Sequence, residues 1–134
     1  MEVLSSRILL RPTDTGRSQR FYRDTLGLPI YREFGSPPHV GIVFFLGGGF
    51  LEVSGSSTEP ATPALQLWLQ VRDVQATRTE LADRGVEILR EPRREPWGLV
   101  EMWISDPDGN ERERLNGPLS MKGFGIVTLR LSSR

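Results

Sequence analysis

Alternation of hydrophobic and polar positions divides the first half of the chain into strands around one helix. Residues 7–12 alternate and predict a strand, with Ile8 and Leu10 on one face. A helix that Asp14 or Thr15 can cap is predicted to run to about residue 26, and Gly27 is a natural stop. Three more strands are predicted, at residues 28–34, 40–46 and 50–54, with residues 35–38 as a break after the first of them.

The same order of elements returns after residues 56–63, a stretch rich in Ser, Thr and Pro that is typical of a linker. A strand is predicted at residues 65–71, and Asp73 can cap a helix that Gly85 ends. Strands at residues 86–89 and 98–105 follow. The turn formers at residues 106–110 then predict a tight turn into a short acidic strand that ends at residue 115.

The two halves therefore form an internal repeat of supersecondary structure. Their helix caps, helix stops and last-strand glutamates recur about 60 positions apart. Since one βαβββ unit leaves a sheet face uncovered, we expect an α+β fold of two such modules. They would pair into a curved mixed β-sheet around a cavity, with the helices outside.

The expected boundaries are a single domain over residues 1–118 and a C-terminal extension over residues 119–134. Module one would span about residues 5–55, the linker residues 56–63, and module two about residues 64–118. Residues 126–131 alternate, so the extension is either an edge strand, a contact with a partner subunit or a disordered tail.

Composition narrows the classes of function. Hydrophobic residues make up 37% and charged residues 25% of the 134 residues, values ordinary for a soluble globular protein. Seventeen basic and seventeen acidic residues balance, which argues against nucleic-acid binding and electrostatic membrane binding. The absence of cysteine excludes disulfides, thiolate nucleophiles and thiolate metal ligands. No apolar run approaches the roughly 20 residues that span a bilayer, so we expect a cytoplasmic protein.

Several motifs together resemble one family. The Trp97-Gly98 pair, the alternating strand after it and the DPDGN turn resemble the end of the second module in the glyoxalase / bleomycin-resistance / extradiol-dioxygenase (vicinal oxygen chelate) superfamily. FYRDTLGLPIYREFG in the first half and LQVRD…TELADRGVEI in the second extend the resemblance over roughly residues 7–117.

The resemblance implies a divalent metal held by one residue from the first and last strand of each module. These positions correspond to Arg7 and Glu52 in module one and to Gln66 and Glu113 in module two, with Glu111 as an alternative to Glu113. Glu52, Gln66 and Glu113 can ligate a metal, whereas a guanidinium has no lone pair to donate. Arg7 therefore argues for a site without metal, in which arginine pairs with glutamate.

Alternation predicts which other side chains share the face of these positions. Arg112 and Arg114 depart from the apolar residues usual in the family, which indicates an exposed strand, a bulge or snorkelling side chains. Aromatic walls with a few polar groups suit a partly aromatic ligand, although both tryptophans would also fit an ordinary core. The candidate ligand-binding residues are Arg7, Leu9, Arg11, Phe50, Glu52, Gln66, Trp68, Glu101, Trp103 and Glu113.

Three hypotheses of function follow. The first is a homodimeric protein that sequesters a small, partly aromatic molecule without a cofactor, as bleomycin-resistance proteins do. The second is a metal-dependent lyase or dioxygenase of the superfamily, using Glu52, Gln66 and Glu113. The third is a metal-free isomerase or lyase with Glu113 as its catalytic carboxylate. His39, the only histidine, follows two prolines and is expected in an exposed loop, away from these positions.

Overall fold

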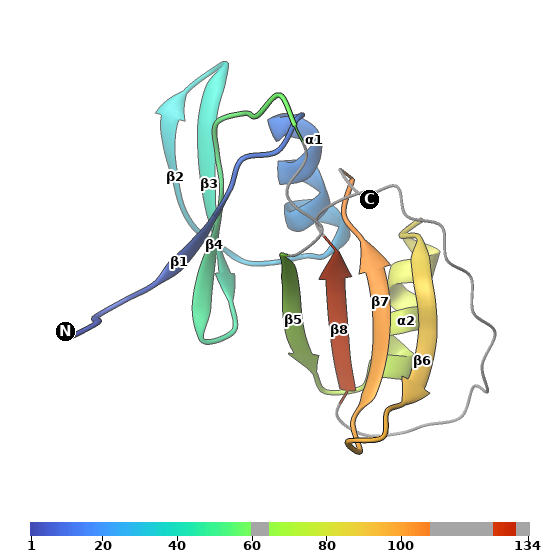
Figure 1. Cartoon of the computed structure of the whole chain (residues 1–134). Helices are drawn as coiled ribbons and strands as arrows, with labels where there is room; N and C mark the ends of the chain where they lie inside the picture. Colours follow the sequence, from blue (N-terminus) through green and yellow to red (C-terminus); the bar gives the residue numbers. More distant parts are fainter. Residues whose placement is uncertain (60–64, 108–124, 131–134) are drawn as a thin grey trace. The chain divides into compact units, whose positions relative to one another are not determined.

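The computed structural model describes residues 1–59, 65–107 and 125–130 of the chain (Figure 1). It separates into two compact units, Met1–Ala61 and Thr62–Arg134, and the division falls inside the predicted linker. Each unit contains one four-stranded mixed sheet. The expected α+β fold with a pair of related modules is confirmed.

The first unit follows the predicted order of strand, helix and three strands. Its elements are β1 (Arg7–Leu10), α1 (Thr15–Arg20), the π-helical turn η1 (Phe21–Thr25), β2 (Ile30–Ser36), β3 (His39–Leu46) and β4 (Gly49–Val53). The strands lie in the order β1-β4-β3-β2, with β1 parallel to β4 and the other pairs antiparallel. Gly35 and Ser36 were expected to break β2, but both pair with β3, and the chain reverses at Pro37-Pro38.

Both predicted helix caps are confirmed. The Asp14 carboxylate accepts a hydrogen bond from the Arg17 backbone N–H at 3.0 Å, and the Asp73 carboxylate accepts one from the Ala76 N–H at 3.0 Å. These contacts satisfy N–H groups that have no partner within the first helical turn. Gly27, after the first helix, has the positive φ of 69° that glycine adopts without strain.

The core of the first unit lies between the sheet and its helix. Tyr22 is fully buried and its ring lies 6.2 Å from that of Phe44, which is also fully buried on β3. Gln19 connects two strands, since its side-chain amide donates to the backbone carbonyls of Val40 and Val53. The helix therefore covers one face of the sheet.

The second unit contains β5 (Gln66–Val71), α2 (Val74–Asp83), β6 (Ile88–Arg94), β7 (Val100–Ser105) and β8 (Gly125–Arg130). Its sheet has the order β5-β8-β7-β6 (Figure 1). Strand β6 continues five residues beyond the predicted end at residue 89. It tolerates Pro92 because it is an edge strand, and its pairing with β7 shifts register there. No helix of the described residues is long and apolar enough to cross a membrane.

Strand β8 corrects the expectation for the C-terminal extension. It lies between β5 and β7, in the interior of the sheet and not at its edge. It runs parallel to β7 and antiparallel to β5, whereas β4, in the corresponding place of the first unit, runs parallel to β1 and antiparallel to β3. The predicted acidic strand at residues 111–115 lies outside the described residues.

The side chains of β8 explain why this strand fits in the interior of the sheet, between β5 and β7. Val127 and Leu129 are buried, and they pair with Leu69 and Leu67 of β5 on the apolar face of the sheet. The arginines at positions 112 and 114 of the predicted strand would have put two cations on that face, at a considerable desolvation cost. The apolar alternation of β8 meets the requirement for a strand packed beneath a helix.

Candidate functional site

Four of the predicted site residues share one face of the first sheet. Parallel pairing of β1 and β4 places Arg7 beside Phe50 and Leu9 beside Glu52. Partners in such a ladder point to the same side of a sheet, and β1 and β4 adjoin one another. The alternation read from the sequence is therefore correct for these four residues.

A short network of polar contacts holds Glu52. Arg7 Nη1 donates to Glu52 Oε1 at 2.8 Å, and Ser54 Oγ donates to Glu52 Oε2 at 2.7 Å. Only 8% of Glu52 is exposed. The hydrogen bonds from Ser54 and then Arg7, with the charges of Arg7 and Arg11, lower the pKa of Glu52 against the opposing effect of burial. Glu52 is thus an ionised carboxylate with both oxygens engaged.

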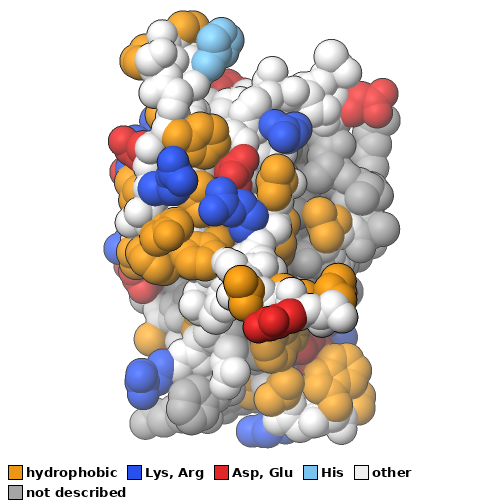
Figure 2. Space-filling model, turned by 90° about the vertical axis from the view of Figure 1, so that its left-hand side faces the viewer, with side chains coloured by type: hydrophobic (Ala, Val, Ile, Leu, Met, Phe, Trp, Pro, Cys, Tyr) orange, Lys and Arg blue, Asp and Glu red, His pale blue; other side chains and the backbone are white. Residues whose placement is uncertain are grey.

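Three aromatic rings cluster beside this ion pair. The Tyr31 ring centroid lies 4.8 Å from that of Phe50 and 5.3 Å from that of Phe45, and all three rings remain partly exposed. Figure 2 shows orange hydrophobic side chains next to blue basic ones on the side of the molecule that it draws. Tyr31 was not among the predicted site residues, because a register shift between Ile30 and Arg32 interrupts the alternation of β2.

The second sheet carries four more of the described candidates on its polar face, whereas Arg11 follows β1 in the first unit. Pairing of β5, β8 and β7 puts Trp68, Thr128 and Trp103 in one row across three neighbouring strands. Glu101 lies two positions before Trp103 on the same face, and Gln66 lies two positions before Trp68. Glu113 belongs to the part of the chain that is not described.

A buried arginine lies next to this row. Arg90 on β6 pairs with Trp103, and its guanidinium carbon is 3.9 Å from the centroid of the Trp103 ring. Arg90 hydrogen-bonds to Glu95, and the side chains of both are 4% exposed. Its guanidinium also lies 3.9 Å from a carboxylate oxygen of Glu101. Burial lowers the pKa of Arg90, while Glu95 and Glu101 oppose that effect.

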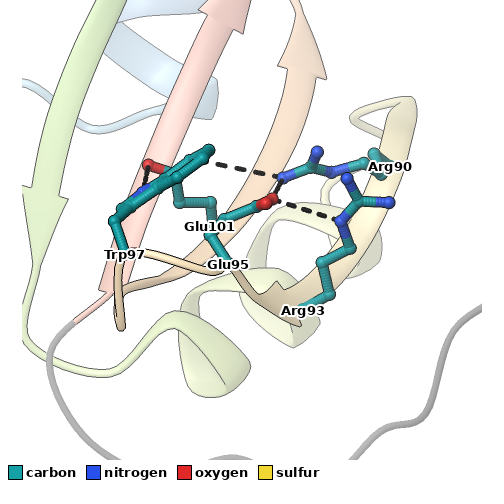
Figure 3. Close-up of polar contacts among 5 residues, drawn as sticks. All are labelled: Arg90, Arg93, Glu95, Trp97 and Glu101. Carbon is teal, nitrogen blue, oxygen red and sulfur yellow. Dashed lines mark hydrogen bonds and ion pairs between the residues drawn. The ribbon is translucent and has the colours of Figure 1, made fainter.

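The contacts around Arg90 continue to the turn between β6 and β7 (Figure 3). Glu95 also accepts a hydrogen bond from Arg93 at 3.2 Å, and the Trp97 indole N–H lies 3.4 Å from Glu101. Arg90 and Glu95 were not predicted, because the expected strand stopped at residue 89. The charged run over residues 90–95 has no apolar alternation, and the pairing of β6 with β7 shifts register within it, so no local signal marks these two residues.

The two positions of the first unit do not fit the metal implied by the superfamily resemblance. In the first unit, Arg7 places a fixed positive charge at one ligand position and Glu52, at the other, already binds Arg7 and Ser54. A divalent cation would have to displace that guanidinium. Within the residues that the structure describes, no three His, Cys, Asp or Glu side chains gather in a group able to hold a metal ion. His39 is exposed at the start of β3.

Comparison with known proteins identifies the family. Residues 5–113 match the model of the Glyoxalase/Bleomycin resistance protein/Dioxygenase superfamily. The chain belongs to this superfamily. No curated protein matches it, so the superfamily assignment rests on the family model.

Solved structures of the superfamily have the same fold. TnmS3, an antibiotic binding protein from Streptomyces sp. CB03234, is 19% identical with a TM-score of 0.66, over 96% of this chain and 95% of that one. A glyoxalase family protein from Enterococcus faecalis is 21% identical with a TM-score of 0.59, over 96% of both chains. At these identities the similarity establishes the fold alone.

Proposed function

We propose that this superfamily member binds a small, partly aromatic and anionic molecule without a metal ion. The observation that carries the proposal is Arg7, which stands at a ligand position of the superfamily and pairs with Glu52 beside exposed aromatic rings. A ligand ring would contact Tyr31, Phe45 and Phe50, while its anionic group would approach Arg7.

The chemistry of Arg7 supports an anionic group. A guanidinium has five N–H donors, and the structure records one hydrogen bond for Arg7 within its described residues, from Nη1 to Glu52. The side chain is 36% exposed, so further donors are accessible to a carboxylate. Paired N–H groups bind carboxylates in a geometry that lysine cannot match. That TnmS3 is an antibiotic binding protein is consistent with a binding role in this fold.

Calorimetry with 2-naphthoate and its uncharged analogue 2-naphthalenemethanol tests the proposal. We expect naphthoate to bind more tightly, and Arg7→Met/Glu52→Gln to remove most of that preference while keeping the site neutral. Arg23→Met is the matched control, because Arg23 pairs with Asp24 on the surface of the same unit. Failure of both compounds to bind the parent protein would contradict the proposal.

Elemental mass spectrometry tests the metal-free part of the proposal. We expect no stoichiometric nickel, manganese, zinc or iron in purified protein or after incubation with each ion. One retained metal per chain would instead make the metal-dependent lyase or dioxygenase the working model. Arg7→His restores a ligand-competent side chain, so metal uptake by this variant alone would support our interpretation of Arg7.

The proposal includes a homodimer, which the superfamily resemblance implies, located in the cytoplasm. Sedimentation velocity at micromolar concentration checks the oligomeric state, and a monomer there would refute it.

A further inference from the structure

Arg32 of β2 lies on the same face of the first sheet as the proposed ligand site. It pairs with Val43 of β3, and Val43 pairs in turn with Glu52 of β4. Partners in a ladder point to the same side of a sheet, so Arg32 and Glu52 share a face. Arg32 is exposed, and in the chain it directly follows Tyr31, whose ring contacts Phe50. A ligand that lies on those rings can therefore reach its guanidinium.

The charge of Arg32 is not neutralised by the strands around it. Of the residues in the four strands of this unit, only Glu33 and Glu52 are acidic. Glu52 forms its ion pair with Arg7. Glu33 pairs with the buried Ile42, and so points to the opposite face, which the helix covers. Within the described residues, the structure records no hydrogen bond or ion pair for Arg32.

A neighbouring ring restrains the position of Arg32. Its guanidinium carbon lies 6.0 Å from the centroid of the Phe34 ring, in the outer range of a cation–π contact. The Phe34 ring occupies the space that a side chain at position 41 would fill, since a Cβ on Gly41 would lie 2.2 Å from Cζ of the ring. Gly41 and Phe34 are also paired in the ladder between β3 and β2. Arg32 thus combines an exposed charge with a supporting ring.

Arg7 and Arg32 lie on opposite sides of the aromatic rings. The strand order β1-β4-β3-β2 puts Arg7 on one outer strand and Arg32 on the other. Phe50 and Phe45 are paired on the two strands between them. Neighbouring strands lie about 4.8 Å apart, so the backbones at the two arginines are separated by roughly 14 Å across the strands. A molecule of two fused rings with an anionic group at each end fits within this interval.

We propose that Arg32 binds a second anionic group of the ligand, at the opposite end of its ring system from the group that approaches Arg7, with Phe34 as a positioning residue for Arg32. This inference rests on the proposed function and deepens it, because it narrows the ligand to a flat aromatic molecule with two negative charges. Since Glu52 already offsets the charge of Arg7, Arg32 supplies the charge that a second anionic group requires.

Calorimetry with 2,6-naphthalenedicarboxylate and its monomethyl ester tests the inference, because the two probes share a ring system and differ by one negative charge. We expect the parent protein to bind the dicarboxylate about fivefold more tightly, which corresponds to the roughly 1 kcal/mol that an exposed ion pair contributes at most. Arg32→Met should remove most of that preference. Arg20→Met is the matched control, since Arg20 is an exposed arginine on α1, the helix of the same unit.

The positioning role of Phe34 has its own pair of variants. Phe34→Leu removes the ring next to the guanidinium and should lower the preference for the dicarboxylate over the ester. Phe34→Tyr keeps the ring and should retain that preference. A preference that is the same in Phe34→Leu as in the parent protein would refute the positioning role.

The outcomes separate this inference from the proposed function. Equal affinity of the parent protein for both probes would overturn the inference and leave the proposed function standing, as would a preference that survives Arg32→Met. Loss of the preference in Arg11→Met but not in Arg32→Met would also overturn it, by assigning the second anionic group to Arg11. Absence of binding by both probes and by 2-naphthoate would overturn the proposed function, and the inference with it.

Discussion

Replacement of Glu95 by leucine should destabilise the protein far more than loss of an ordinary salt bridge. The Glu95 and Arg90 side chains are both 4% exposed, so Glu95→Leu leaves a buried guanidinium without its nearest counter-ion. Removal of one partner from a buried pair typically costs 3–5 kcal/mol. Because Glu101 remains 3.9 Å from Arg90, we expect about 3 kcal/mol.

Urea unfolding, followed by circular dichroism, measures this change in the free energy of unfolding. The matched control is Glu91→Leu, since Glu91 pairs with Arg78 at 2.8 Å but the two side chains are 27% and 32% exposed. That control should cost about 1 kcal/mol or less. The double variant Arg90→Met/Glu95→Leu should recover most of the loss, because no charge is left buried alone.

Two results would refute this reasoning. A cost for Glu95→Leu equal to that for Glu91→Leu would mean that burial of the pair has no energetic consequence. A double variant less stable than Glu95→Leu would mean that the Arg90 guanidinium stabilises the fold without Glu95.

Two further predictions concern the first unit. Ser54 and Arg7 lower the pKa of Glu52 in the folded state. The stability that ionised Glu52 contributes is therefore complete above the ordinary glutamate pKa of about 4.3 and is lost as pH falls through the lower folded value. Thermal unfolding between pH 6 and 3 should show a smaller loss of stability for Glu52→Gln than for the parent protein. Gly41→Ala should cost about 1–3 kcal/mol, because its Cβ would lie 2.2 Å from Cζ of Phe34, and Phe34→Ala in the same chain should relieve most of that cost in urea unfolding.

Local signals in the sequence were sufficient for the beginnings and ends of both predicted helices. Asp14 and Asp73 cap the two helices as predicted, and Gly27 and Gly85 follow them with positive φ. Such features depend on a few neighbouring residues, so the sequence reveals them directly. Strict alternation likewise placed Glu52 on the correct face of its strand.

Features that depend on distant partners were missed. The bulge that brings Tyr31 beside Phe45 arises from pairing of two strands and leaves no clear local signal. Arg90 is buried only because Trp103 and Glu95 surround it, and a charged residue after a short apolar run is usually the end of a strand. Positions set by alternation along one strand were therefore easier to predict than positions set by contacts between strands.

The identity of the fourth strand in the second sheet also depends on distant partners and was not predicted. Two segments, residues 111–115 and 125–130, follow the turn after β7, and family resemblance favoured the first. Which strand fits is decided by the helix-facing side chains, and Val127 and Leu129 supply the apolar pair. Strand direction did not decide which segment fits, since β8 runs parallel to its neighbour β7, whereas its counterpart β4 runs antiparallel to β3.

The interior place of β8 has a consequence for the behaviour of damaged or incompletely folded chains. Six residues near the C-terminal end form ladders with both β5 and β7, so their loss would leave two rows of backbone N–H and C=O groups unpaired in one sheet. Such open edges recruit strands from other molecules and start aggregation. Proteolytic removal of residues 125–130 should therefore lead to aggregation, even though the described helices and the strands of the first unit would be intact.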